Sequence, residues 1–287
     1  MTVAIVTDSG SDLTPTQLRE NKIRQVALSV TIGDRSYLSP DELTADEFWR
    51  LMRTPGCPGA HTAAPSAGQF KQAFETAFEE GADSIVCVCL SETLSSTIGS
   101  ARMAREMLSG REIHIVDSRS ASMATGALAL RGATMAAHGA TAVEIAAEMN
   151  RLRGEITLFV ALDTLEYLRK GGRISAARAA VGGLLSVKPI ITVEEGIVVT
   201  ADQPRTRTKA LARVLELLTD QPAVEVHIMY SPPADDVAFR EAVLAHMPEP
   251  APKLITVQTL GPVIGAHIGP GAYGAVLVLE GRTVEGP

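Results

Sequence analysis

The chain reads Ser84-Ile-Val-Cys-Val-Cys-Leu90 and continues as Ser91-Glu-Thr-Leu-Ser-Ser-Thr97, and this junction decides the fold class. A short, continuous apolar run predicts a buried strand, and the hydroxyl-rich turn after it leads into a helix that should end near residue 108. A second strand follows at residues 113–116, before a long alanine-rich helix that reaches toward His138. Strands that alternate with helices predict a mainly parallel sheet covered on both faces.

The same alternation extends toward the N-terminus. At Thr14 the pattern is a hydroxyl N-cap, Pro15 at the first helical position and Gln17 at the third, which predicts a capping box. Ser66 and Gln69 repeat that spacing. The other predicted elements of this half are extended segments at residues 3–7 and 24–32 and helices at about residues 44–53, 66–79 and 142–153. The first half is therefore predicted to be an α/β domain with a Rossmann-like sheet.

The pattern changes after Gly154. Glu194-Glu-Gly196 joins two apolar runs, and a glycine in that position predicts a hairpin turn. The other predicted elements are strands at residues 156–162, 224–229, 254–259 and 275–279 and helices at about residues 165–169, 207–218 and 234–245. At roughly 150 residues per domain, the 287 residues divide into a domain over residues 1–155 and a second α/β domain, with a mixed sheet, over residues 156–287.

Composition excludes several classes of protein. The chain is 46% hydrophobic and 21% charged, values of ordinary globular proteins, which excludes a disordered chain. Its net charge of −7 argues against a nucleic-acid partner, and an aromatic content of 4% supplies few side chains for stacking on bases or sugars. The N-terminus has no signal-peptide pattern, and no apolar run reaches the roughly 18 residues of a membrane span. We therefore expect a cytoplasmic protein.

The motifs of common cofactors are missing. Neither a P-loop nor a GxGxxG fingerprint occurs, and the three cysteines form no CxxC pair, so no nucleotide, cofactor or metal is expected. Cys87 and Cys89 are predicted to be reduced core residues. Asp8 and Asp12 are predicted to cap surface turns, which is the more common role for such aspartates, instead of binding a metal.

Four segments that follow predicted strands are rich in hydroxyls or glycine: residues 7–12, the loop at Thr62, residues 91–97, and Asp117-Ser118. In an open parallel sheet such loops gather at one edge, where the N-termini of helices favour anions. Ser66 and Ser118 are predicted to be helix caps. A cap explains less at Thr62 and Ser95, which makes both candidates for anion binding.

A hydrolase is the enzyme alternative. It would use Ser95 as the nucleophile with His267 and Asp117, although the GxSxG pattern of a nucleophile elbow is absent around Ser95. His267 lies in a glycine-rich segment, residues 261–271, that has no periodicity and is predicted to be a loop. Its sequence leaves both a functional and a structural role open for His267, and the same holds for Arg173.

Taken together, these segments resemble the DegV family of bacterial proteins that bind long-chain fatty acids. The resemblance spans nearly the full length and is carried by many short motifs in order. They are Thr7-Asp-Ser-Gly-Ser-Asp-Leu13, Thr62-Ala-Ala-Pro-Ser66, residues 91–97 with Ser100-Ala101, Val116-Asp-Ser118, Leu165-Glu-Tyr-Leu-Arg-Lys-Gly-Gly-Arg-Ile-Ser175, Lys188-Pro-Ile190 and the segment around His267.

The resemblance implies two α/β domains with an acyl tunnel between or beside them. It also implies that Thr62 and Ser95 bind the carboxylate, and that Arg173 and His267 near the tunnel mouth serve phosphotransfer with a separate fatty acid kinase. The family commonly has a glycine where this chain has Ser96, which adds one hydroxyl near the head group. The resemblance thus implies a non-catalytic lipid-binding protein whose partners are a long-chain fatty acid and a kinase subunit.

Overall fold

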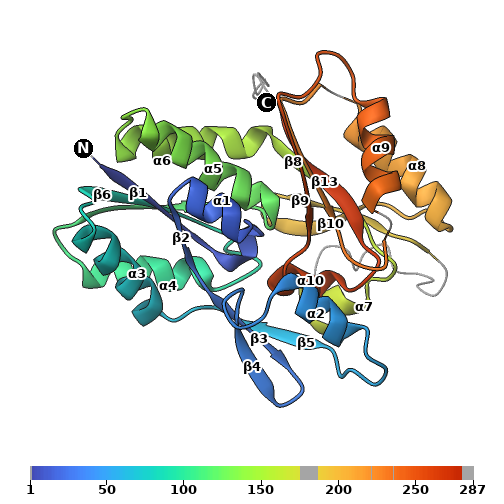
Figure 1. Ribbon diagram of the computed structural model, residues 1–287, viewed down its shortest axis with the longest axis horizontal. Coiled ribbons are helices and arrows are strands. Elements are labelled where there is room, and N and C mark those ends of the chain that lie inside the picture. The colour runs from blue at the N-terminus through green and yellow to red at the C-terminus, as the bar shows by residue number, and fades with distance from the viewer. Residues whose placement is uncertain (1, 175–186, 221, 235, 280–287) are drawn as a thin grey trace. The chain divides into compact units, whose positions relative to one another are not determined.

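The computed structural model describes residues 2–174, 187–220, 222–234 and 236–279 (Figure 1). The described residues form two compact units. One comprises Met1–Arg153 together with Glu194–Ile197 and Leu260–His267, and the other comprises Gly154–Val193, Val198–Thr259 and the residues from Ile268 onward. His267, which the sequence analysis assigned to the second domain, therefore lies in the first unit.

A parallel four-stranded sheet forms the centre of the first unit. Its order is β2-β1-β6-β7, and all three neighbouring pairs are parallel. The strands are β1 (Val3–Asp8), β2 (Ile23–Val26), β6 (Ser84–Cys89) and β7 (Glu112–Asp117). Every residue of β6 is buried, including Cys87 and Cys89, whose thiols are free. The prediction of a mainly parallel sheet is confirmed.

Helices cover both faces of this sheet. In Figure 1, α3 and α4 lie on one face and α5 and α6 on the other. The helices are α1 (Pro15–Glu20), α2 (Ala45–Met52), α3 (Ala67–Glu79), α4 (Thr97–Met107), α5 (Met123–Ala137) and α6 (Ala142–Leu152), with a short 3-10 turn η1 (Ser9–Ser11) after β1. The predicted capping boxes at Thr14 and Ser66 are both present.

A small antiparallel sheet, ordered β4-β3-β5, was missed by the sequence analysis. It consists of β3 (Leu28–Ile32), β4 (Arg35–Ser39) and β5 (Ala60–Ala63). Thr62 lies on β5 opposite Val30, so the prediction of a loop there is wrong. Ala-His-Thr-Ala has neither an apolar run nor clear alternation, and its pairing with β3 supplies the order that local sequence does not. A single residue, Ala27, separates β2 from β3, so this sheet continues from the carboxyl end of β2.

The second unit contains a mixed six-stranded sheet, ordered β10-β9-β8-β13-β11-β12, as predicted. Strands β11 and β12 are parallel, whereas β13 is antiparallel to both β8 and β11. The elements are β8 (Ile156–Ala161), α7 (Glu166–Lys170), β9 (Ile190–Glu194), β10 (Ile197–Asp202), α8 (Arg207–Leu218), β11 (Glu225–Tyr230), α9 (Asp236–His246), β12 (Leu254–Thr259) and β13 (Tyr273–Val278). A core cluster that includes Val214, Ile228 and Phe239 packs α8 and α9 onto the sheet.

The segment around His267 is a helix, α10 (Pro262–Ile268), and the prediction of a glycine-rich loop is wrong. Gly265 lies inside this helix because a Cβ there would come within 2.6 Å of Phe48 and 2.7 Å of Trp49. Gly269, which directly follows Ile268 and has a φ of 75°, ends the helix, and Gly271, with a φ of 81°, lies in the turn after it. One glycine thus ends the helix, one lies in the following turn and one allows close packing, although the glycine content of the segment is typical of a loop.

Candidate functional site

Two of the predicted site residues are in direct contact. The hydroxyl Oγ1 of Thr62 and the ring nitrogen Nε2 of His267 are 2.8 Å apart, and both side chains are partly buried. Thr62 is presented by β5 and His267 by the last turn of α10, 205 positions later in the chain. A hydroxyl has one hydrogen to donate and can also accept. If Nε2–H donates to Thr62, the hydrogen of Thr62 is available for an external acceptor.

The start of α10 is held by hydrogen bonds to the rest of the first unit at two consecutive residues, Leu260 and Gly261. The indole Nε1–H of Trp49 donates to the carbonyl of Leu260 over 2.7 Å, and the amide of Gly261 donates to Oδ1 of Asp12 over 3.0 Å. Trp49 and Leu260 are each 1% exposed, so the hydrogen bond between them is shielded from solvent. These contacts fix the helix that carries His267, and the sequence contains no signal that pairs these distant positions.

Ser95 lies immediately before α4 in a turn that its own hydroxyl stabilises. Its Oγ accepts from the amide of Thr97 over 3.3 Å and is 2.8 Å from the hydroxyl of Thr97. The N-cap residue of α4 is Ser96, which is exposed and makes no side-chain capping bond. The first amides of a helix carry partial positive charge and need acceptors. This helix start can therefore accept an anion beside the hydroxyl of Ser95.

The turn of the β9–β10 hairpin holds the segment before Ser95, a contribution that the sequence analysis missed. The hydroxyls of Ser91 and Thr93 both donate to the carbonyl of Gly196, the former over 2.9 Å. Gly196 has a φ of 83°, and a Cβ on it would come within 2.5 Å of Ser91 Oγ. Next to it, Glu195 pairs with Arg119 over 2.6 Å.

Asp8 is buried, and the prediction that it caps a surface turn is wrong about its environment. Its side chain is 0% exposed and accepts from the amides of Gly10 and Leu90 over 2.7 and 2.9 Å. Burial raises its pKa to about 6, although both amide bonds act in the opposite direction. Asp8 thus ties the end of β1 to the end of β6.

Asp12 is also buried, at 7% exposure. One carboxylate oxygen accepts from the hydroxyl of Ser122 over 2.5 Å and the other accepts from Gly261. Burial raises the pKa of Asp12 to about 7. The bonds from Ser122 and Gly261 oppose that rise, and the nearby charge of Asp8 adds to it. The prediction of a surface cap is wrong here as well, because the carboxylate joins three segments of the unit.

The helix-cap predictions for Ser66 and Ser118 have different outcomes. Ser66 accepts from the amide of Gln69 and caps α3. Ser118 instead accepts from the amide of Ser120 over 3.2 Å and lies 2.9 Å from the hydroxyl of Thr125, so its prediction as a cap is wrong. Four residues separate it from the start of α5, and its turn is closed locally.

The residues of the hydrolase alternative do not form a relay in the described part of the chain. Ser95 bonds with Thr97, His267 bonds with Thr62, and Asp117 accepts from the amide of Arg119 over 2.9 Å. A nucleophile and its base must lie within hydrogen-bond reach. The geometry thus gives no support to Ser95 as a nucleophile.

Arg173 belongs to the second unit, just after α7. Its guanidinium donates to the carbonyl of Gly171 over 2.5 Å and the side chain is partly buried. The next residues of its motif include Ser175, which lies outside the described residues.

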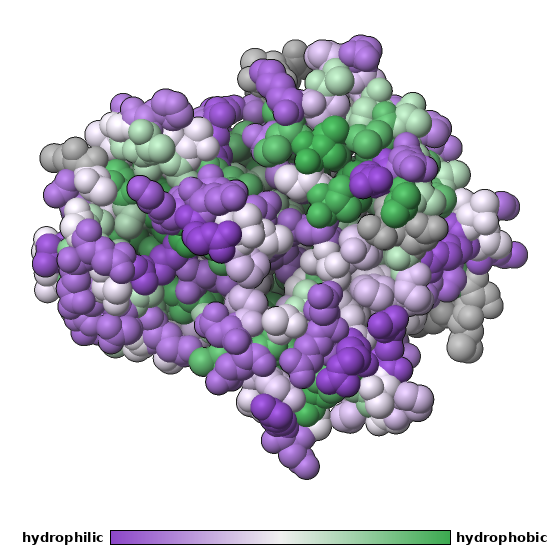
Figure 2. All heavy atoms as spheres, in the orientation of Figure 1, coloured by the Kyte–Doolittle hydropathy of each residue, from purple (hydrophilic) through white to green (hydrophobic). Residues whose placement is uncertain are grey.

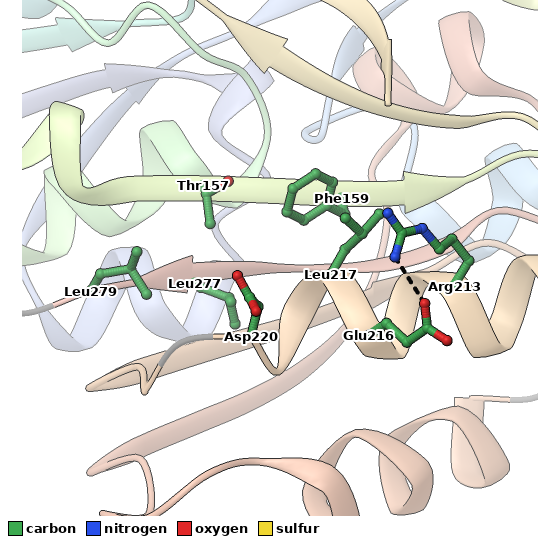
Figure 3. Close-up of a pocket in the computed structure, with 8 residues that line it drawn as sticks. All are labelled: Thr157, Phe159, Arg213, Glu216, Leu217, Asp220, Leu277 and Leu279. Atoms are coloured by element: carbon green, nitrogen blue, oxygen red, sulfur yellow. Dashed lines mark hydrogen bonds and ion pairs between the residues drawn. The ribbon is translucent and has the colours of Figure 1, made fainter. Parts of the chain in front are cut away.

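Two cavities lined by described residues, one in each unit, contain none of the predicted site residues. In the second unit, a cavity of about 420 Å³ lies beside α8, with Phe159 and Leu277 on its apolar side and an ion pair between Arg213 and Glu216, 2.8 Å long, at its rim (Figure 3). In the first unit, a cavity of about 780 Å³ follows the edge strand β2.

Residues 2–174, 187–220, 222–234 and 236–279 contain neither a metal-binding cluster nor a membrane-spanning helix. No group of three His, Cys, Asp or Glu side chains in these ranges is arranged to hold a metal ion. None of the helices in them combines the length and apolar content needed to cross a membrane. The surface is a mosaic of polar and apolar side chains, as Figure 2 shows for one face.

Comparison with known proteins gives one family over almost the whole chain. The model of the DegV family, described as "Uncharacterised protein, DegV family", matches residues 2–280. A DegV domain-containing protein of Listeria monocytogenes is 34% identical over 279 residues, which cover 95% of this chain and 96% of the relative.

Solved structures agree. A DegV family protein from Thermus thermophilus is described as binding fatty acid. It is 32% identical with a TM-score of 0.88, and the match covers 97% of this chain and all of that one. DegV of Bacillus subtilis, described as a fatty acid binding protein, has 27% identity and a TM-score of 0.86, with 98% of this chain and all of that one covered.

Proposed function

The chain belongs to the DegV family, and from that premise we propose that it binds a long-chain fatty acid and presents the carboxylate. The relatives from Thermus thermophilus and Bacillus subtilis are described as binding fatty acids. The observation that carries the proposal for this chain is the contact between Thr62 and His267, because with Nε2–H as the donor the hydroxyl hydrogen of Thr62 is available for an external acceptor.

Hydrogen bonds from neutral donors bind the carboxylate in this proposal. A carboxylate that leaves water must collect several hydrogen bonds. Thr62 supplies a hydroxyl, Ser95 a second one, and the uncapped start of α4 supplies amides with a favourable dipole. The exposed hydroxyl of Ser96 adds a further donor at the same helix start.

The tautomer of His267 decides whether Thr62 can act in this way. A Thr62 hydroxyl that donates to Nε2 would direct lone pairs at the ligand and repel a carboxylate. With Nε2–H as the donor, Thr62 accepts from the ring and donates to the ligand. We therefore assign the hydrogen to Nε2 in the fatty-acid complex.

The acyl chain supplies most of the affinity. Each buried CH₂ contributes about 0.8 kcal/mol, so a chain of about 16 carbons gains on the order of 10 kcal/mol before ordering costs. Aliphatic side chains suit a flexible saturated chain, and this protein has 46% hydrophobic residues with only 4% aromatic. The acyl tunnel that the resemblance implies stays a prediction.

We further propose that a separate fatty acid kinase phosphorylates the presented carboxylate. The chain contains no P-loop or dinucleotide fingerprint, so the nucleotide would come with the partner. In this proposal Arg173 serves the encounter with the kinase. His267 contacts the hydroxyl of Thr62, so in this proposal it serves both the binding of the carboxylate and the transfer of phosphate to it. Arg173→Ala should then retain fatty acid but slow acyl-phosphate formation.

Native mass spectrometry of the protein as purified, followed by organic extraction, tests the binding proposal. We expect a non-covalent mass of one fatty acid that extraction removes. Thr62→Val should lose most of it, because valine keeps the shape and removes the hydroxyl, whereas Thr31→Val on β3 is the matched control. A protein that binds no fatty acid after incubation with palmitate would contradict the proposal, and a covalent acyl-serine adduct at Ser95 would favour the hydrolase alternative.

A further inference from the structure

A buried carboxylate lies at the start of the helix that carries His267. Asp12 Oδ1 accepts from the amide of Gly261, the residue immediately before α10, over 3.0 Å. The backbone approaches closely, since a Cβ on Gly261 would lie 2.7 Å from that oxygen. The carbonyl of Gly261 in turn accepts from the amide of Gly265 over 2.8 Å, within the first turn of α10. Asp12 thus holds the residue on which this helix begins.

The orientation of this carboxylate is itself fixed. Asp12 has a φ of 55°, a left-handed conformation that aspartate tolerates better than most residues. Its second oxygen accepts from Ser122, which also has a positive φ, of 57°, and whose amide donates to the carbonyl of Gly10 over 2.8 Å. Two residues in uncommon conformations brace each other, and the direction of the carboxylate toward Gly261 follows from that brace.

The distance from this attachment to His267 is short. From Gly261 to His267 is six residues, about 9 Å along a helix. Because so short a helix moves nearly as one body, an ångström of movement at Gly261 is carried to the imidazole. The bond from Nε2 to Thr62, 2.8 Å long, tolerates little displacement before it is lost.

We propose that Asp12 is a positioning residue for head-group binding: through the backbone of Gly261 it sets His267 within hydrogen-bond reach of Thr62. The proposal rests on the proposed function, because the pair it positions is the one that we expect to orient the carboxylate. Asp12 itself does not touch the ligand. The indole of Trp49 donates to the adjacent carbonyl of Leu260 and so supports the same attachment.

Asp8 provides an internal contrast. It is a second buried carboxylate on the same loop, but its bonds go to Gly10 and Leu90 and none of its described bonds goes to α10. A role through burial and charge alone would be shared by both aspartates. A role through α10 belongs to Asp12.

A double-mutant cycle on palmitate affinity tests the proposal. Asp12→Ala should weaken binding about tenfold in the native background, the size of a lost bond to a charged group. In the His267→Ala background the same change should cost less than about twofold, because the residue that Asp12 positions is already absent. Asp8→Ala should cost the same factor in both backgrounds.

Asp12→Asn separates the hydrogen bond from the charge. Its amide oxygen can still accept from Gly261, so palmitate affinity should stay within about threefold of the native value. In ¹⁵N spectra of the histidine rings, the signals of His267 should keep their native shifts in Asp12→Asn and move in Asp12→Ala. If Asp12→Ala does not fold, Ser122→Ala, which removes the brace, takes its place in the cycle.

The outcomes distinguish a failure of the proposed function from a failure of the proposed role of Asp12. If the native protein does not bind palmitate, the proposed function fails. If it binds, and the effects of Asp12→Ala and His267→Ala multiply as independent factors, the proposed function survives and the role of Asp12 is overturned. Equal losses in Asp12→Asn and Asp12→Ala would overturn it as well.

Discussion

Five helices of the first unit begin in two different ways. Capping boxes begin α1, α3 and α6. In each, the side chain of the N-cap residue accepts from the third helical amide, and the amide of the N-cap residue donates to the side chain of that third residue; the N-cap residues are Thr14, Ser66 and Thr141. Helices α4 and α5 have serine at the N-cap, Ser96 and Ser122, yet neither serine makes a capping bond. The second pair begins after β6 and β7, beyond the carboxyl edge of the parallel sheet.

The serine hydroxyls at these two starts have partners other than the N2 or N3 amides. Ser122 bonds Asp12, whereas Ser95, one residue ahead of the N-cap of α4, bonds the hydroxyl of Thr97 and accepts from its amide, the first of the helix. A side-chain cap contributes roughly 1 kcal/mol to stability. This unit gives up that contribution at the sheet edge where α/β proteins bind ligands. A hydroxyl residue at the N-cap thus caps and stabilises α1, α3 and α6, whereas the N-cap serines of α4 and α5 make no capping bond.

The largest expected effect concerns Asp12 at the uncapped start of α5. Burial raises its pKa from an ordinary value of 3.8 to about 7 in the folded protein. The folded state therefore holds this proton more tightly than the unfolded chain does. Protonated Asp12 contributes stability that is fully present below pH 3.8 and is lost as the pH rises through 7. From pH 5 to 8 this loss is on the order of 2 to 3 kcal/mol, and Asp12→Asn should abolish it. Urea unfolding of both proteins at the two pH values measures the difference.

Asp8→Asn is the control for that measurement. The pKa of Asp8 is raised only to about 6. Asp8→Asn should therefore remove a loss of stability between pH 5 and 8 that is roughly half as large as the loss removed by Asp12→Asn. An identical pH dependence of stability in the native protein and Asp12→Asn would contradict the burial of an ionising carboxylate at this helix start.

The next effect is on ligand affinity at the uncapped start of α4. Ser95→Ala should weaken palmitate binding by roughly 10- to 100-fold, because a hydrogen bond to a charged group contributes about 1.5 to 3 kcal/mol. Isothermal titration gives the affinity. Ser100→Ala, in the first turn of α4, is the matched control and should bind normally. Equal affinity in Ser95→Ala and the native protein would show that this open start is not part of the head-group site.

Sequence patterns predict best those structural features whose interacting residues lie close together in the chain. The boxes at Thr14 and Ser66 could be recognised because cap and partner lie three residues apart and bond within one helical turn. The alternation of strands and helices is local in the same sense. For Ser118 the local signal was misleading, since a turn of its own satisfies the hydroxyl.

The candidate site depends on pairings that no local pattern encodes. Thr62 and His267 are 205 positions apart, and 249 positions separate Asp12 from Gly261. The helix at His267 was missed because Gly265 reads as a helix breaker until Phe48 and Trp49 are seen to exclude a side chain there. Local spacing could name the individual hydroxyls, whereas only the fold shows which of them meet.

A smaller effect is expected at a closed start. Ser66→Ala in α3 should lower the free energy of unfolding by about 1 kcal/mol and leave palmitate affinity unchanged, the reverse of Ser95→Ala. Chemical denaturation and titration of the same samples give both quantities. If Ser66→Ala instead weakened binding without a loss of stability, the contrast between closed and open starts would not hold.

The smallest effect distinguishes the closed starts from each other. The boxes of α1 and α3 use Gln17 and Gln69, whereas that of α6 uses Glu144, whose carboxylate accepts from the amide and hydroxyl of Thr141. These bonds hold the pKa of Glu144 below its usual value of 4.5. The contribution of the carboxylate is therefore present above pH 4.5 and lost as the pH falls through the folded pKa. Glu144→Gln should slightly lower the unfolding midpoint at pH 7, and this deficit should shrink as the pH falls through the folded pKa of Glu144, while Gln69→Ala should lower the midpoint equally at pH 7 and pH 3. A deficit of Glu144→Gln that is the same at pH 7 and pH 3 would mean that the charge of Glu144 has no part in closing α6.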